Sequence, residues 1–294
     1  MQPLYRSPFT SLLLYNSLCC SDGQNQFTWV QGGVDSGPTS TGLCCFRKGY
    51  GYNFHFLEPP QPMVFGSTLP SKEFSHKLDY IGFVKKAIEY VHHNNISSIV
   101  FSIDSMAMIG AAVYQETGLP GPTFESEFLC LHKYYSRKTE PSNLWCECVF
   151  LSHQGMTGEI KFPCFTKPAT LTGSLGIFKV YNHSDLEKAL ALYREHLPPL
   201  VQALQPLFSR YLNLQQYPLA VTAVAVIEEL VEDGGKSHCL EGWADSRGAF
   251  HHWSTYDAIS YTDQQENLVG FFIPSLEPPD SIAAIVDHTS RTMG

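Results

Sequence analysis

Apolar residues recur with a helical period between residues 79 and 93, and polar residues separate them. Ile81, Val84 and Ile88 fall on one face of this stretch, and Asp79 stands where the N-cap of a helix is expected. The pattern therefore predicts an amphipathic helix that ends at about residue 93.

A continuous apolar run, Ile96–Ile103, follows and is typical of a buried strand. Asp104 or Ser105 then opens a second helix, and Gly118 and Pro120 stop it in the order that helix C-termini favour. A helix, a buried strand and a helix in succession indicate an α/β unit with a parallel sheet.

Residues 1–70 have a different composition, rich in glycine and proline and poor in charged residues. Such a segment favours short strands and irregular loops over helices. The best strand candidates lie at 9–15 and 50–57. No function follows from the residues of this segment.

The second half of the chain predicts helices mixed with antiparallel strands, an α+β arrangement. Thr123 caps a helix that runs to about Arg137. The other predicted elements are strands over 162–168, 177–182, 220–231, 240–244 and 249–254, and helices over 185–196, from there to about 212, and from 281 onward.

Composition and charge exclude several classes of protein. The chain has 294 residues and a net charge of −9, which argues against nucleic-acid binding through a basic face. No apolar run approaches the ~18 residues of a membrane span. The nine cysteines include no C-x-x-C pair, and their odd number fits a reducing compartment. We therefore expect a cytoplasmic protein without nucleic-acid or membrane partners.

Three segments that suit a nucleoside triphosphate follow one another in the second half. Lys167 ends a buried strand, where it can offer a cation to phosphate oxygens. The Gly-Ser-Leu-Gly turn at 173–176 exposes backbone N–H groups and a hydroxyl that can fold over phosphates. Later, Glu228–Val231 ends an apolar strand, so its backbone can face an adenine edge and its acids can bind ribose hydroxyls.

Each segment taken alone has a simpler interpretation. Lys167 suits a surface strand end, the turn at 173–176 suits a plain hairpin, and Glu228 suits a solvated strand end. His251 and His252 point to opposite faces of one strand, which argues against a metal pair. The functional interpretation therefore depends on the order of the three segments.

That order (strand–Lys–Pro, Gly-rich turn, strand, helix, strand–Glu–Glu) resembles the ATP-grasp superfamily, in particular its carboxylate–amine ligases. Leu119–Pro122 followed by Leu129–Arg137 resembles the helix that contributes a first ATP-contacting lysine, here Lys133. Leu240–Trp243 and Phe271–Leu276 resemble later segments of the same fold. The resemblance covers about residues 79–294.

The resemblance implies a fold that is both α/β and α+β. A Rossmann-like pre-ATP-grasp domain would span 1–120, and an ATP-grasp domain would span 121–294 with a small lobe at about 161–231. The implied cofactors are ATP and Mg²⁺, and the implied substrates are a small-molecule carboxylate and an amine, joined by a C–N bond through an acyl phosphate. The residues implied to bind ATP are Lys133, Lys167, Gly173, Ser174, Gly176, Glu228, Glu229, Leu230 and Val231.

The resemblance also predicts an ATP-grasp domain that lacks its last catalytic strands. In the superfamily an acid on one late strand and a Glu-x-Asn pattern on the next hold Mg²⁺, and Thr289–Gly294 lies in the helix before them. We therefore expect no metal ligand in this chain, weak ATP binding, no turnover, and self-association through an exposed C-terminal surface. A non-catalytic ATP-grasp-like binding or interaction protein is the alternative, and no catalytic residue is identified.

Overall fold

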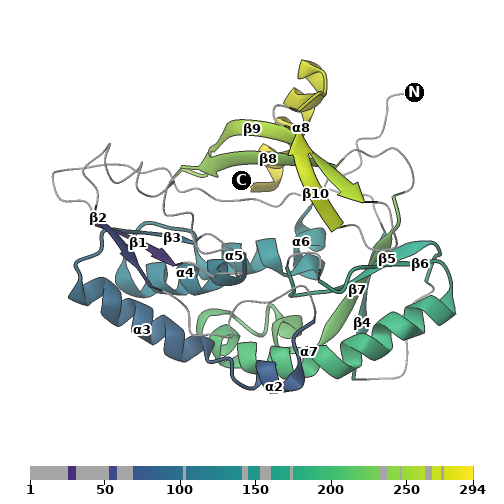
Figure 1. Cartoon of the computed structure of the whole chain (residues 1–294), viewed down its shortest axis with the longest axis horizontal. Helices are drawn as coiled ribbons and strands as arrows, with labels where there is room; N and C mark the ends of the chain where they lie inside the picture. The colour runs from purple at the N-terminus through teal and green to yellow at the C-terminus, as the bar shows by residue number, and fades with distance from the viewer. Residues whose placement is uncertain are drawn as a thin grey trace.

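The structure, a computed structural model, describes the chain in segments (Figure 1). These are residues 26–30, 53–57, 69–101, 104–140, 145–152, 160–172, 175–231, 237–245, 247–261, 267–272 and 275–293. The predicted strand at 9–15, and Gly173 and Ser174 of the Gly-rich turn, lie outside the described residues.

The N-terminal part contains a parallel three-stranded sheet with the strand order β2-β1-β3. Its strands are β1 (Gln26–Val30), β2 (Asn53–Phe56) and β3 (Ser98–Phe101). The predicted parallel sheet is confirmed, with β2 and β3 inside the predicted strand regions. β1 has no counterpart among the predicted strands.

Helices α2 (Lys72–Ser75), α3 (Tyr80–His93) and α4 (Asp104–Thr117) complete this part. The cap predicted for α3 is present, because the Asp79 carboxylate accepts the Gly82 backbone N–H at 2.8 Å. α4 ends before Gly118, whose φ of +71° is the left-handed conformation that a helix C-terminus favours. The helix–strand–helix prediction is therefore confirmed.

One helix predicted from Thr123 to Arg137 is in fact two, α5 (Phe124–Leu131) and α6 (Lys133–Thr139). The Thr123 hydroxyl caps α5 through the Ser126 N–H, as predicted. The chain leaves the helical conformation at His132, where ψ is 95°. A tertiary contact explains the break, because the Lys133 backbone N–H donates to the carbonyl of Ala169 at 2.8 Å.

A four-stranded antiparallel sheet with the order β4-β7-β5-β6 forms the middle of the molecule. The strands are β4 (Cys146–Phe150), β5 (Cys164–Pro168), β6 (Phe178–Val180) and β7 (Val224–Glu229). β4 was not among the predicted strands. The strand predicted over 220–231 is shorter than expected, because Pro218–Val221 forms a 3₁₀ turn.

The two helices predicted between 185 and 212 are one continuous helix, α7 (His183–Tyr211). Pro198, Pro199 and Pro206 lie inside it and withhold three backbone N–H donors, which normally stops a helix. The buried leucines on both sides of Pro198 and Pro199, among them Leu197 and Leu200, belong to the main core. Apolar burial along the whole length therefore outweighs the lost hydrogen bonds.

The C-terminal part is an antiparallel sheet with the order β10-β9-β8 and a final helix. Its elements are β8 (Ser237–Ala244), β9 (Phe250–Tyr261), β10 (Asn267–Phe272) and α8 (Pro279–Met293). α8 contacts β9, and Ile285 and Thr289 are buried. The C-terminal surface that was expected to be exposed is therefore covered at these two residues.

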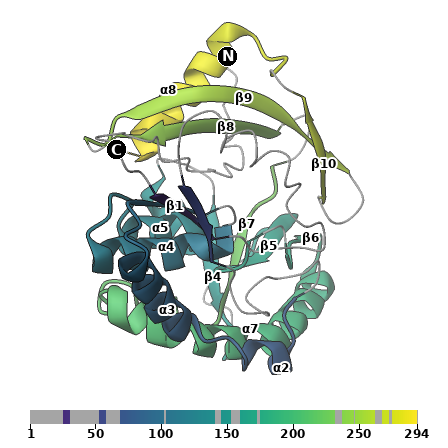
Figure 2. The ribbon, with the colours of Figure 1, turned by 60° about the vertical axis from the view of Figure 1, so that its left-hand side comes forward.

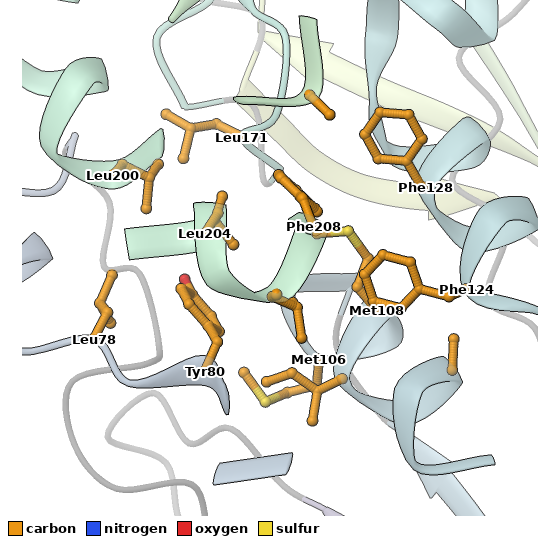
Figure 3. Packing of buried hydrophobic residues seen from close by; sticks show 14 of the residues in the cluster. Leu78, Tyr80, Met106, Met108, Phe124, Phe128, Leu171, Leu200, Leu204 and Phe208 are labelled. Atoms are coloured by element: carbon orange, nitrogen blue, oxygen red, sulfur yellow. The ribbon is translucent and has the colours of Figure 1, made fainter. Parts of the chain in front are cut away.

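The main core joins the first helices to the middle sheet through α7. Buried residues from α3, α4, α5 and α7 form one cluster with residues of β5 and β7. Figure 3 shows Leu204 and Phe208 of α7 between Tyr80 on one side and Phe128 on the other. The middle sheet is thus anchored on the face that α7 covers.

The β8–β10 sheet lies on the opposite side of the middle sheet from α7 in both views (Figures 1 and 2). No helix in the described part of the chain is long and apolar enough to span a bilayer.

Candidate functional site

The two faces of the middle sheet carry different side chains. Cys164 and Ile227 point to the α7 side and belong to the main core. Residues of the opposite face are fixed by the register, in which Phe165 pairs with Glu228 and Lys167 pairs with Val226. Because directly paired residues share a face, Lys167 and Glu228 lie together on the face away from α7.

Lys167 and Glu228 form a buried ion pair on this face. The Lys167 Nζ lies 2.7 Å from Glu228 Oε2, and the residues are only 1% and 7% exposed. Burial lowers the pKa of the Lys167 ammonium, and the Glu228 charge partly offsets that effect. Burial by itself raises the pKa of Glu228, but Lys167 and Arg137 outweigh it and leave that pKa below its ordinary value.

Arg137 of α6 is the third member of this ionic group. Its Nε donates to Glu228 Oε1 at 3.1 Å and a terminal nitrogen donates to Oε2 at 3.4 Å. Its other terminal nitrogen donates to Glu140, at the end of α6. The nearby carboxylates raise the pKa of Arg137 further despite its burial. One guanidinium therefore joins two carboxylates beside Lys167.

Lys133 reaches the same sheet from the start of α6. Its ammonium donates to the carbonyl of Leu171, and its backbone N–H binds the carbonyl of Ala169, just after β5. Lys133 and Arg137 are four residues apart, so both lie on the same face of α6, which packs on β4. The structure thus brings Lys133, Lys167 and Glu228 to one region, as the sequence interpretation requires.

The remaining predicted residues border this region or lie outside the described chain. Gly176 has a φ of +69° and lies against Leu69 and Pro168, so both its conformation and its packing favour glycine. Glu229 is exposed, and its backbone N–H donates to the Trp145 carbonyl at 3.0 Å. Leu230 and Val231 are half-buried and follow the last residue of β7.

Arg137 and Glu140 are the residues of this ionic group that the sequence interpretation missed. Arg137 was placed only as the end of a predicted helix. The available signal was its spacing, because a residue four positions after Lys133 on a helix must share its face. The partner Glu228 is distant in sequence, and only the fold brings the two together.

The described residues were expected to contain no metal site. Within them, no three His, Cys, Asp or Glu side chains are grouped so that they could hold a metal ion. His251 and His252 have separate partners: His251 contacts Asp245, and His252 contacts the Thr255 hydroxyl. The carboxylates around Arg137 face cations rather than an open metal position.

Several solved structures match nearly the whole length of this chain. An L-amino acid ligase from Bacillus licheniformis matches 92% of this chain with a TM-score of 0.67 at 12% identity. The chain has an ATP-grasp fold. No protein-family model matches the sequence.

Two further ATP-grasp structures match at similar identity. N5-carboxyaminoimidazole synthetase from Staphylococcus aureus, complexed with ADP, matches 95% of the chain with a TM-score of 0.54 at 11% identity. The biotin carboxylase domain of Hydrogenobacter thermophilus 2-oxoglutarate carboxylase, in complex with MgADP, matches 92% with a TM-score of 0.56 at 13% identity.

The matches cover only part of these ATP-grasp structures. The chain spans 62% of the L-amino acid ligase, 65% of the S. aureus synthetase and 58% of the biotin carboxylase domain.

Proposed function

We propose that this chain binds ATP or ADP on the face of the middle sheet that carries Lys167 and Glu228. The observation that carries the proposal is the meeting of Lys167 with Glu228, next to Lys133, inside an ATP-grasp fold. Two lysines from different elements offer positioned cations to a polyphosphate. An ionised carboxylate beside them gives the site an acceptor for the nucleoside end.

Each residue has a part in this proposal. Lys133 and Lys167 neutralise phosphate oxygens, and the turn that contains Gly173, Ser174 and Gly176 covers them with backbone N–H groups. The adenine is bound along Glu228, Glu229, Leu230 and Val231, where β7 ends. The Glu229 N–H is bonded to the Trp145 carbonyl, so the backbone of Leu230 and Val231 is the part that bonds the ligand edge.

The reaction type that we propose is ATP-dependent ligation of a carboxylate to an amine, with weak or no turnover by this chain itself. Bound ATP would supply the phosphoryl group that converts the carboxylate into an acyl phosphate with release of ADP, and an amine would then displace phosphate to form the C–N bond. The contribution of this chain is to position the polyphosphate and to neutralise its charge. We assign no Mg²⁺ ligand to the described residues, because they contain no suitable group of acids.

Calorimetric titration with ADP tests the binding proposal. Lys167→Met removes a charge-assisted contact worth roughly 1.5–3 kcal/mol, which corresponds to about a tenfold to hundredfold weaker ADP affinity. The matched control is Lys161→Met, an exposed lysine that precedes the same strand, and it should leave the affinity unchanged. Equal ADP affinity in the wild type and Lys167→Met would remove Lys167 from the site.

Binding and turnover are separated by a second measurement. Release of ADP from ATP, with pools of carboxylates and amines present, reports ligase activity. Nucleotide binding without substrate-dependent ADP release would favour the alternative, an ATP-grasp-like protein that binds without catalysing.

A further inference from the structure

Arg137 is a largely buried charged group, with its side chain 14% exposed, to which the proposed nucleotide site gives no role. Its guanidinium contacts Glu228 and Glu140 at once. Three of its nitrogens are engaged, so the side chain is fixed by both carboxylates. Arginine suits this task because its planar fork holds two acceptors in a set geometry.

The charges around Glu228 leave it with two cationic partners, Lys167 and Arg137. A phosphate that attracts the Lys167 ammonium draws it away from the carboxylate. With Lys167 as the sole partner, that movement would leave a buried, unpaired Glu228, which is costly. With Arg137 in place, Glu228 keeps a charged partner after the lysine has turned.

We propose that Arg137 is a positioning residue that holds the Glu228 carboxylate while Lys167 turns from Glu228 to a phosphate of the bound nucleotide. The inference rests on the proposed function, and it gives Arg137 a role without contact to the nucleotide. Glu140 completes the arrangement by holding the outer side of the guanidinium, so that Arg137 stays on Glu228 rather than following the phosphate.

In this arrangement, the effect of Arg137 on ligand affinity depends on whether the ligand carries a phosphate. ADP draws Lys167 away from Glu228, so its affinity depends on Arg137. Adenosine has no phosphate, so Lys167 stays paired with Glu228, and the loss of Arg137 should affect adenosine binding much less than ADP binding. A residue that merely supported the fold would change the affinity for both ligands.

The test is a double-mutant cycle read by calorimetry with ADP and with adenosine. Arg137→Met should weaken ADP binding roughly tenfold or more and weaken adenosine binding much less. Arg137→Lys, which keeps the charge, should recover part of the loss. In a Glu228→Gln background no charge needs to be held, so Arg137→Met should have no further effect on ADP.

Lys138→Met is the matched control, because Lys138 is the next cation on α6, is exposed, and lies 5.2 Å from the Tyr134 ring. It should not alter either affinity. If Arg137→Met does not fold, Arg137→Lys replaces it in both backgrounds, with thermal melts of every variant to confirm the folded state.

Three results would overturn the inference while the proposed function stands. They are an unchanged ADP affinity in Arg137→Met, an equal loss for ADP and adenosine, and the same loss in the Glu228→Gln background, which would mean that Arg137 acts on the ligand itself. A wild-type chain that binds no ADP would instead overturn the proposed function, and this inference with it.

Discussion

The two faces of the middle sheet carry different kinds of side chain, although the same four strands form both. On the α7 side, Cys164 and Ile227 are buried among apolar side chains and carry no charge. The other side carries the alternate residues of the same strands. These are Phe165 and Lys167 of β5 and Glu228 of β7, which directly follows Ile227. Strand alternation therefore places a fold-determining face and a charged face back to back.

The charged face is not uniformly polar. Cys148, Ala169, Val224 and Val226 form a small apolar cluster there, against which Tyr134 of α6 packs. The ionic group lies at one side of this cluster. Because buried ion pairs contribute little net stability, the comparison supports the proposal that the charges serve nucleotide binding, whereas the apolar face serves folding.

The largest loss of unfolding free energy should come from replacing the carboxylate of the ionic group while both of its cations remain. Glu228→Leu leaves Lys167 and Arg137 buried without their shared carboxylate, and we expect a loss of roughly 3–5 kcal/mol in unfolding free energy. Glu229→Leu, at the exposed neighbouring position, is the control and should cost little. Urea unfolding of both variants measures the difference, and equal losses would mean that the pairing is not energetically coupled.

A cut into the apolar face should destabilise the protein for a different reason. Ile227 is fully buried against the α7 side, so Ile227→Ala should cost about 2–4 kcal/mol by lost burial and a residual cavity. This loss should be the same at low and high salt, because no charge is involved. A loss that shrank strongly with salt would contradict the assignment of this face to the core.

A titratable group within the aromatic part of the core offers a pH test. His132 is 1% exposed and packs against the rings of Phe128 and Tyr135, and burial lowers its pKa from 6.5 to about 4. Below pH 6.5, His132 is protonated in the unfolded chain but stays neutral in the folded chain until the pH approaches 4. Stability should therefore fall as pH drops from 6.5 toward 4, by up to roughly 3 kcal/mol.

The variant that isolates this effect is His132→Phe. It keeps an aromatic ring among aromatic rings and removes the titration, so its stability should vary less over the same pH range. Thermal melts at several pH values compare it with the wild type. An identical pH dependence in both proteins would assign the effect to other groups.

The smallest expected effect concerns a helix far from the sheet. Asp79→Ala removes the carboxylate that accepts the Gly82 N–H, and we expect a loss of about 1 kcal/mol. ADP affinity should not change, because α3 belongs to the parallel-sheet part of the molecule. A large change in ADP affinity would mean that the two parts are coupled.

Local chemistry explains which elements the sequence predicted well. α3 and α4 have helical periodicity with caps at the expected residues, and β3 is a short apolar run, so their signals are local. The errors arose where tertiary contacts decide. α7 passes through Pro198 and Pro199 because its leucines are buried on both sides of them, and His132 interrupts a helix at a contact with the middle sheet.

The candidate site follows the same division. Lys167 and Glu228 could be predicted as site residues because each stands at the end of an apolar strand. Lys133 could be predicted because of its place in a segment that resembles the ATP-grasp superfamily. Arg137 was not visible as a site residue, because its partner Glu228 lies 91 positions away in the sequence. β4, which carries two of the cysteines on the charged face, is a short strand of five residues, CECVF, and was missed although four of the five are apolar.

The central claim is that the charged face serves nucleotide binding and not folding, and one experiment tests it directly. The variant Arg137→Met, Lys167→Met, Glu228→Leu replaces the three ions by apolar side chains together, and it leaves only Glu140, which is 15% exposed and contacts the Ser136 hydroxyl, without its cation. ADP is titrated into this variant and into the wild type, and both are unfolded in urea. We predict ADP binding by the wild type alone, with unfolding free energies within about 2 kcal/mol of each other. Equal ADP affinity in both proteins, or a folded wild type that binds no ADP, would contradict the account.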